Sequence, residues 1–229
     1  MAGFDTVLFD AGNTLMWMDY ALLASAMLAD CDAADAERVR LAEHRARPDL
    51  DRWLESATST ESASTFRTYV GLVLRELGST GEEAIDRAVA ALLPRRREIW
   101  TQPAPGAARV LGELCARGYS LGVVSNSDGS VASLLQGAGL AQYLGVIVDS
   151  SLVGVEKPDP AIFRFALEAL ESHPARTLYV GDIPSVDHRA AQRAGMGFAL
   201  LDPLGLRGDL SVLRVRALDG LLAHLPALR

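Results

Sequence analysis

The sequence predicts an α/β protein whose core is a doubly wound, Rossmann-like parallel sheet, with an all-helical domain inserted after the first strand. Two observations lead to this fold class. After about residue 103, short and almost continuously apolar runs alternate with segments of helical periodicity, which is typical of parallel strands covered on both faces. Between about residues 17 and 97, only helical periodicity is found. We therefore expect a core domain of residues 1–16 and 97–229 and a helical cap domain of residues 17–96.

The first strand is predicted over Thr6–Phe9, an apolar run that ends at Asp10 and leads into a tight loop. The helices of the insertion are expected at Tyr20–Cys31, Ala33–Ala46, Ser62–Leu77 and Glu82–Leu93. Asp32 and Ser62 are suited to helix N-caps, while Gly78 and Pro94 interrupt the helical pattern. We expect no strand in this part of the chain.

The rest of the core domain alternates between the two kinds of element. Helices are predicted at Val110–Arg117, Val131–Gln136, Ala161–Leu170 and His188–Ala194. Strands are predicted at Leu121–Val124, Val146–Val148, Leu178–Val180 and Phe198–Leu201. Because these strands are short, apolar and separated by helices, they favour a parallel sheet that is buried on both faces.

Composition excludes several classes of function. The 229 residues carry a net charge of −7 and no basic stripe, so we expect no nucleic-acid binding. No apolar run approaches the roughly 18 residues of a membrane-spanning helix, and the N-terminus lacks the pattern of a signal peptide. Cys31 and Cys115 lack metal-ligand spacing and are interpreted as reduced thiols. These features predict a cytoplasmic protein without a membrane partner.

Polar residues follow the predicted strands at the edge where open parallel sheets bind their ligands. They are Asp10 and Thr14 after the first strand, Ser125 and Asn126 after the second, and Gly181, Asp182 and Asp187 after the fourth. Lys157 precedes a helix in the segment VEKPDP and is the only lysine of the chain. All other long basic side chains of this protein are arginines. A single lysine therefore indicates a position that requires the compact ammonium charge of lysine and does not accept the planar guanidinium of arginine.

Three carboxylates in one cleft would repel one another unless a cation lies among them. Mg²⁺ fits this requirement, since it takes one or two carboxylates together with waters and a substrate phosphate. Mg²⁺ and Lys157 would roughly balance the charge of a phosphate dianion and of Asp10. The hydroxyls of Thr14 and Ser125, with the amides after Asp10, would bind the phosphate oxygens. This set of groups suits phosphoryl transfer through an aspartyl-phosphate.

Four segments carry a resemblance to a known family: VLFDAGNTL, LGVVSNS, VEKPDP and VGDIPSVDHRAAQRAGM occur in this order. The chain resembles the haloacid dehalogenase-like (HAD) hydrolase superfamily, in the branch with a helical cap after the first strand. The resemblance implies a role for each matching residue: Asp10 is the nucleophile, Thr14 and Ser125 bind phosphate, and Lys157 is the charge-neutralising base. It also implies a Mg²⁺ site formed by Asp10, Asp182, Asp187 and the Gly12 carbonyl.

The resemblance also implies a substrate. A phosphatase of this branch would close its cap over a small phosphorylated metabolite during attack by the nucleophile. We expect Ala11, Gly12 and Asn126 to contact this substrate. Trp17 and Tyr20 follow the first loop closely, and we interpret them as lining the substrate pocket.

One residue departs from the family pattern. Phosphatases that this chain resembles usually carry a second aspartate two positions after the nucleophile as general acid and base, whereas this chain has Gly12. Loss of such a group is typically worth about 10²–10⁴-fold in rate. A cap residue such as Asp19 or His44 would supply the proton, or the leaving group would need none, or the protein would be a weakly catalytic or regulatory phosphate-binding member.

Two kinds of relative also lack that aspartate. The phosphonate-cleaving branch uses a cap lysine, and residues 17–96 contain none. The 2-haloacid dehalogenases need no metal and resemble this chain in their aspartate, serine and lysine; a cap arginine such as Arg45 or Arg47 would hold the substrate carboxylate. They generally do not keep the acidic pair found here as Asp182 and Asp187, so dehalogenation is the alternative to phosphate chemistry.

Overall fold

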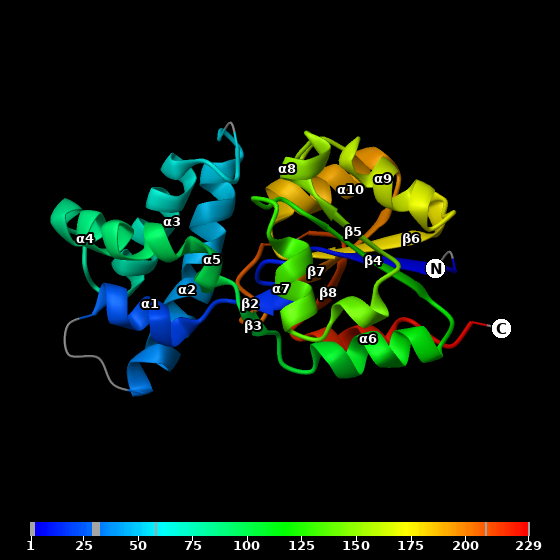
Figure 1. Cartoon of the computed structure of the whole chain (residues 1–229), viewed down its shortest axis with the longest axis horizontal. Coiled ribbons are helices and arrows are strands. Elements are labelled where there is room, and N and C mark those ends of the chain that lie inside the picture. The colour runs from blue at the N-terminus through cyan, green and yellow to red at the C-terminus, as the bar shows by residue number, and fades with distance from the viewer. Residues whose placement is uncertain (1–2, 29–32, 58, 209, 229) are drawn as a thin grey trace. The chain divides into compact units, whose positions relative to one another are not determined.

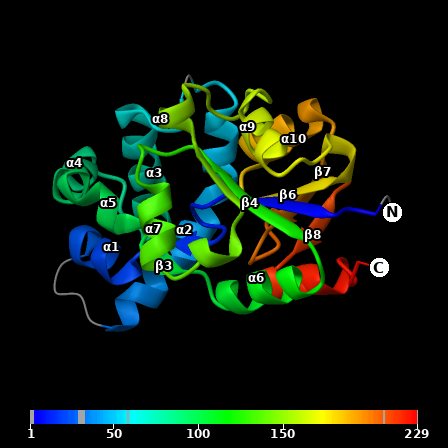
Figure 2. The ribbon, with the colours of Figure 1, turned by 45° about the vertical axis from the view of Figure 1, so that its right-hand side comes forward.

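The computed structural model describes residues 3–28, 33–57, 59–208 and 210–228. The chain divides into two compact units, one formed by Met1–Trp17 with Pro103–Arg229 and the other by Met18–Gln102. The first is an α/β unit and the second is helical, as Figures 1 and 2 show. Asp32, expected as a helix N-cap, and Cys31, expected as a reduced thiol, lie outside the described residues. Cys115 is a free, exposed thiol.

The α/β unit is built on six parallel strands in the order β5-β4-β1-β6-β7-β8. They are β1 (Thr6–Phe9), β4 (Ser120–Ser125), β5 (Val146–Asp149), β6 (Thr177–Gly181), β7 (Gly197–Leu201) and β8 (Leu213–Val215). Strand β1 lies in the middle, with Phe9 level with Val123 of β4 and with Val180 of β6. The predicted strands are therefore confirmed, with ends that move by one residue. Strand β8 was not predicted, because a three-residue edge strand has no apolar run of its own.

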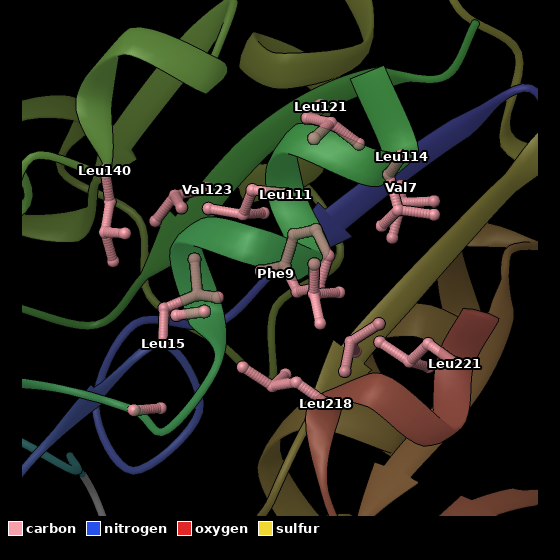
Figure 3. Packing of buried hydrophobic residues seen from close by; sticks show 14 of the residues in the cluster. Val7, Phe9, Leu15, Leu111, Leu114, Leu121, Val123, Leu140, Leu218 and Leu221 are labelled. Atoms are coloured by element: carbon pink, nitrogen blue, oxygen red, sulfur yellow. The ribbon is translucent and has the colours of Figure 1, made fainter. Parts of the chain in front are cut away.

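Helices cover both faces of this sheet (Figure 1). They are α6 (Ala107–Ala116), α7 (Val131–Gly137), α8 (Ser150–Val153), α9 (Ile162–Ala169) and α10 (Arg189–Ala194), together with the 3₁₀ turn η5 (Leu218–Ala223). Alternate side chains of β1 point to opposite faces, as the pleat requires. Val7 and Phe9 join the cluster formed with α6, α7 and η5, part of which Figure 3 shows. Leu8 joins the cluster on the other face, with α9 and α10. Burial on both faces explains why these strands are continuously apolar.

The helical unit contains α1 (Tyr20–Met27), α2 (Ala33–Leu54), α3 (Ala63–Glu76), α4 (Glu82–Leu92) and α5 (Arg96–Ile99). Ser62 caps α3 as expected, with its side chain accepting from the amide of Thr65 at 3.1 Å. Helix α1 ends at Met27, before the expected end. Helix α2 continues past Ala46 with Pro48 inside it, because a proline removes one helical hydrogen bond without necessarily ending the helix.

Two short strands at the ends of the helical insertion were not predicted from the sequence. Strand β2 (Met16–Trp17) pairs with β3 (Gln102–Pro103) in a two-stranded sheet. These are the segments in which the chain leaves the α/β unit and returns to it. Two residues show no period of two, so sequence patterning does not reveal such a strand.

Candidate active site

The nucleophile expected from the sequence lies one residue beyond the central strand. Asp10 is 8% exposed, and its amide donates to the carbonyl of Val180 at 2.8 Å, which continues the ladder between β1 and β6. The chain then folds back, because the amides of Thr14, Leu15 and Met16 all donate to the carbonyl of Ala11. This tight loop holds Thr14 in the interior: its side chain is fully buried and its Oγ1 has no hydrogen-bond partner among the described residues.

The single lysine is held by three oxygens at the same edge of the sheet. Lys157 is 2% exposed, and its ammonium donates to Asp10 Oδ1 at 2.6 Å, to Asp187 Oδ1 at 2.8 Å and to the hydroxyl of Tyr179 at 2.7 Å. An ammonium has three hydrogens, so these contacts use all of them. Tyr179 in turn donates its proton to the carbonyl of Val124 at 2.8 Å. The compact point charge expected at this position is therefore directed onto the nucleophile.

Tyr179 is a site residue that the sequence analysis missed. It lies in β6, fully buried, and its ring packs edge-on against Phe163 with the centroids 4.8 Å apart. The ammonium of Lys157 is 2.7 Å from the hydroxyl but 5.2 Å from the ring centroid, so it lies beyond the hydroxyl rather than over the ring face. The sequence did contain a signal for this role: a tyrosine within the apolar run of the strand. Because a buried tyrosine hydroxyl needs a hydrogen-bond partner, Tyr179 could have been expected to contact a polar group.

Asn126 positions Lys157 through the backbone. Its side-chain oxygen accepts from the Lys157 amide at 2.8 Å, and its side-chain nitrogen donates to the Lys157 carbonyl at 2.9 Å. Substrate binding by Asn126, expected from the sequence, stays a prediction; the structure shows that its side chain holds the backbone of Lys157. Ser125, at the end of β4, is 3% exposed, and its hydroxyl makes a 3.3 Å contact with the carbonyl of Asn126.

The acidic pair after β6 is held by its own backbone. Asp187 lies in the π-helical turn η4 (Pro184–His188), and its Oδ2 accepts from the amides of Asp182 at 3.0 Å and Ile183 at 2.9 Å. Gly181 makes room for this carboxylate, because a Cβ at that position would lie 2.5 Å from Asp187 Cγ. Asp182 is itself 3% exposed. The structure thus brings Asp182 to the strand end beside that of Asp10.

Burial and charge shift the ionisation of these groups. Burial raises the pKa of Asp10 to about 6; the charge of Lys157 opposes this shift and that of Asp187 adds to it. Burial alone would lower the pKa of Lys157, but the two carboxylates outweigh it and raise that pKa above its usual range. Burial, followed by the negative charge of Asp187, also raises the pKa of Tyr179. At neutral pH the lysine is a cation and the tyrosine is neutral.

The donor set fits a divalent cation and a phosphate. Three buried carboxylates lie at this edge with one ammonium, which leaves an excess of negative charge that Mg²⁺ would balance. Within the described residues, no three His, Cys, Asp or Glu side chains gather closely enough to form a metal cluster. Mg²⁺ typically takes one or two carboxylates beside waters and phosphate. The unsatisfied hydroxyl of Thr14 suits a phosphate oxygen.

The helical unit contains a separate buried polar cluster. Glu43, which is fully buried, accepts from Arg47 Nε at 2.6 Å and Nη2 at 2.8 Å, from the Tyr20 hydroxyl at 3.1 Å and from the Tyr69 hydroxyl. Burial would raise the pKa of Glu43, but Arg47 lowers it below its usual value. The hydroxyl of Tyr20 is used within this cluster. The fork of Arg47, considered above as a substrate-carboxylate binder, already holds a carboxylate of the protein.

Both proton donors suggested by the sequence, Asp19 and His44, lie in the helical unit. Asp19 caps α1, with its Oδ1 accepting from the Leu22 amide at 2.9 Å. His44 is 3% exposed, and burial, reinforced by the charge of Arg47, lowers its pKa to about 4.

Trp17 is partly buried against the core cluster of the α/β unit, whereas Tyr20 belongs to the helical unit. Both are still predicted, rather than observed, to line the substrate pocket.

His44 leads to a prediction about acid stability. Because its pKa falls from 6.5 in the unfolded chain to about 4 in the folded one, the unfolded state binds more protons between these values. The contribution of His44 is complete above pH 6.5 and is lost as the pH falls toward 4. We expect the free energy of unfolding to decrease by about 2 kcal/mol from this residue between pH 7 and pH 5. Denaturant unfolding of His44→Gln at both pH values should show a smaller decrease than the wild type; equal decreases would contradict the prediction.

Comparisons with known proteins agree with this fold. A family model described as a haloacid dehalogenase-like hydrolase matches residues 4–195. Phosphoserine phosphatase of Thermus thermophilus is 38% identical over 137 residues, which are 59% of this chain and 53% of that protein. The fold is similar to that of the HAD-hydrolase YfnB from Bacillus subtilis, in a structure bound to magnesium, with a TM-score of 0.66 and 19% identity. The two structures match over 97% of this chain and 99% of the YfnB chain. A 2-haloacid dehalogenase from Pseudomonas syringae has a TM-score of 0.58 at 25% identity, over 97% and 98% of the two chains.

The sequence relatives match through part of their length. The chain spans about half the length of the curated relatives with 36% to 38% identity. In the part of the chain that the structure describes, no helix has both the length and the apolar character needed to cross a membrane.

Proposed function

Since the chain belongs to the haloacid dehalogenase-like hydrolase family, we propose that it is a Mg²⁺-dependent phosphatase that acts on a small phosphorylated metabolite through an aspartyl-phosphate on Asp10. The observation that carries the proposal is the ammonium of Lys157 held 2.6 Å from Asp10 and 2.8 Å from Asp187, next to the strand end with Asp182. A phosphatase among the sequence relatives and a magnesium-bound structural neighbour support it.

In the first step, a carboxylate oxygen of Asp10 bonds to phosphorus, and the bond between phosphorus and the ester oxygen breaks. The leaving alcohol takes up a proton as it departs. Lys157 keeps Asp10 oriented and compensates its negative charge. The hydroxyls of Thr14 and Ser125 donate to the phosphate oxygens. In the second step, water attacks phosphorus, and the bond to Asp10 breaks, which releases phosphate and restores the carboxylate.

The metal would be held by Asp10, Asp182 and the carbonyl of Gly12. When bound, Mg²⁺ neutralises phosphate charge and supports the in-line geometry of the transfer. Asp187 contributes by fixing the backbone of Asp182 and by sharing Lys157, so its part in the Mg²⁺ site is indirect. These groups stand at the carboxyl ends of β1 and β6, which are neighbours in the sheet.

The proposal is tested by phosphate release from an aryl phosphate, with and without Mg²⁺. We expect turnover that depends on Mg²⁺ and stops when a chelator removes it. An aryl phosphate is the suitable first substrate because its leaving group departs without a proton, which avoids the missing aspartate at Gly12. A folded protein that releases no phosphate with Mg²⁺ present would contradict the proposal.

Dehalogenation is a second candidate for two reasons. The 2-haloacid dehalogenases also lack the second aspartate that Gly12 replaces in this chain, and the fold is similar to that of a 2-haloacid dehalogenase. In that reaction Asp10 would displace halide from carbon and water would then hydrolyse the ester. The occupied fork of Arg47 weighs against it as the carboxylate binder. Chloride release from a 2-chloro acid without Mg²⁺, in the absence of phosphate release from the aryl phosphate, would favour this reaction. A protein that binds Mg²⁺ and phosphate but carries out neither reaction would be a regulatory member.

A further inference from the structure

A second buried cation reaches the acidic pair from a distant loop. Arg207 follows β7 and is only 8% exposed, and its Nη2 donates to the carbonyl oxygen of Asp182 at 3.0 Å. The two residues are 25 positions apart. Neither the four sequence segments nor the spacing of polar residues after the strands singles out Arg207.

The carbonyl that Arg207 contacts is part of a peptide group that is held at both ends. The amide of Ile183, on the other side of the same peptide bond, donates to Asp187 Oδ2 at 2.9 Å. The preceding amide, that of Asp182 itself, donates to the same oxygen at 3.0 Å. The next carbonyl, that of Ile183, accepts from the amides of Val186 and Asp187 within η4. Thus Asp187 fixes both amides around Asp182, and Arg207 fixes the carbonyl.

The loop that carries Arg207 is shaped for this contact. Asp202, 5% exposed, accepts from the amide of Leu206 with one oxygen and from that of Arg207 with the other, both at 3.1 Å. Gly205 has a φ of +69°, which a glycine adopts without strain. Arg214 of β8 donates to the Arg207 carbonyl at 2.8 Å. A buried guanidinium costs desolvation, so a loop that buries it and directs its Nη2 to the Asp182 carbonyl indicates a specific use for the charge.

We infer that Arg207 is a positioning residue for Asp182 in Mg²⁺ binding. With both flanking peptide groups fixed, the Cα–Cβ bond of Asp182 has one direction, and its carboxylate is presented to the metal without a loss of backbone entropy on binding. Arg207 acts through Asp182 and does not touch the substrate. The inference rests on the proposed function, because it takes Asp182 as a ligand of Mg²⁺.

The test measures Mg²⁺ binding by calorimetry in the absence of substrate and, separately, kcat and KM with an aryl phosphate. Arg207→Met removes the hydrogen-bond donor and the charge, and we expect the Mg²⁺ dissociation constant to rise by about 10- to 100-fold, as is typical for partners of metal ligands. At subsaturating Mg²⁺ kcat should fall, while KM stays within about twofold. Arg207→Lys, which keeps a cation and a donor, should recover part of the loss.

A matched control separates this effect from a general loss of an arginine. Arg117 also donates from its guanidinium to backbone carbonyls, those of Leu222 at 2.7 Å and Leu225 at 2.6 Å, but at the end of the sheet where β4 begins. Arg117→Met should leave the Mg²⁺ dissociation constant unchanged. Circular dichroism and thermal unfolding establish that each variant is folded at the assay temperature.

The outcomes distinguish the inference from the function on which it rests. If the wild type binds Mg²⁺ and Asp182→Asn does not, but folded Arg207→Met binds as tightly as the wild type, the inference is overturned and the function stands. If Arg117→Met weakens Mg²⁺ binding as much as Arg207→Met, the effect is structural and the inference is also overturned. If the wild type neither binds Mg²⁺ nor releases phosphate, the proposed function fails, and the inference falls with it.

Discussion

Asp10→Asn is expected to lower kcat for phosphate release by at least about 10³-fold, because an amide oxygen does not form the phosphoryl ester that the reaction needs. The fold should survive this change. Asp10 is buried and its pKa is raised to about 6, so the folded state penalises its charged form at neutral pH, and a neutral side chain of the same shape removes that penalty. The buried ammonium of Lys157 keeps the carboxylate of Asp187, at 2.8 Å, as its partner in the variant. We therefore expect an inactive variant with an undiminished thermal midpoint when Mg²⁺ is left out.

The control for this variant is Asp219→Asn, which changes the same chemical group at an exposed position in η5. It should keep wild-type turnover. The nucleophile is identified directly by stopping the reaction with hydroxylamine, which converts an aspartyl-phosphate into a hydroxamate that mass spectrometry locates on the peptide with Asp10. Asp10→Asn with more than about a tenth of wild-type kcat would exclude Asp10 as nucleophile.

Gly12→Asp is expected to raise kcat for an alkyl phosphate by about 10²–10⁴-fold, because it supplies a general acid two positions after the nucleophile. Because the phosphatases that this chain resembles usually carry aspartate at this position, we expect the loop to accept the substitution. The increase should be much smaller for an aryl phosphate, whose leaving group needs no proton. The ratio of the two rates, measured for wild type and variant under the same Mg²⁺ concentration, is the quantity to compare.

Gly12→Asn is the matched control, since it adds a side chain of the same size that has no acidic proton to give. It should leave the ratio of alkyl to aryl rates unchanged. An equal increase in both variants would attribute the effect to packing of the loop. An unchanged ratio in Gly12→Asp would show that a proton donor is already present elsewhere in the protein, despite the helix-capping role of Asp19 and the lowered pKa of His44.

Much of the fold was predictable from the sequence because burial on both faces leaves a clear trace. In a strand such as Thr6–Phe9 every residue after the first is apolar, and the polar residue that follows the strand marks the edge where ligands bind. The ordered segments around Asp10, Lys157 and Asp182 likewise indicated the family. Short elements without periodicity, such as β2, β3 and β8, left no such trace.

Tertiary structure decided which partners each residue has. Residue types identify Asn126 as a candidate at a strand end, but only packing shows both ends of its amide on the backbone of Lys157. The same holds for Arg47. From the sequence it is a candidate for binding a substrate carboxylate, whereas in the fold it is the ion-pair partner of Glu43.

By itself, then, the sequence determined the fold class, the family and the residue types at the strand ends, since each of these is a local property of a pattern. Tertiary structure alone decided that Tyr179 receives the third hydrogen of Lys157 and that Arg207 reaches the carbonyl of Asp182. The physical reason is the same in both cases. A buried polar atom takes whichever partner the packing of distant segments brings within hydrogen-bond distance, and no local pattern records which partner that is.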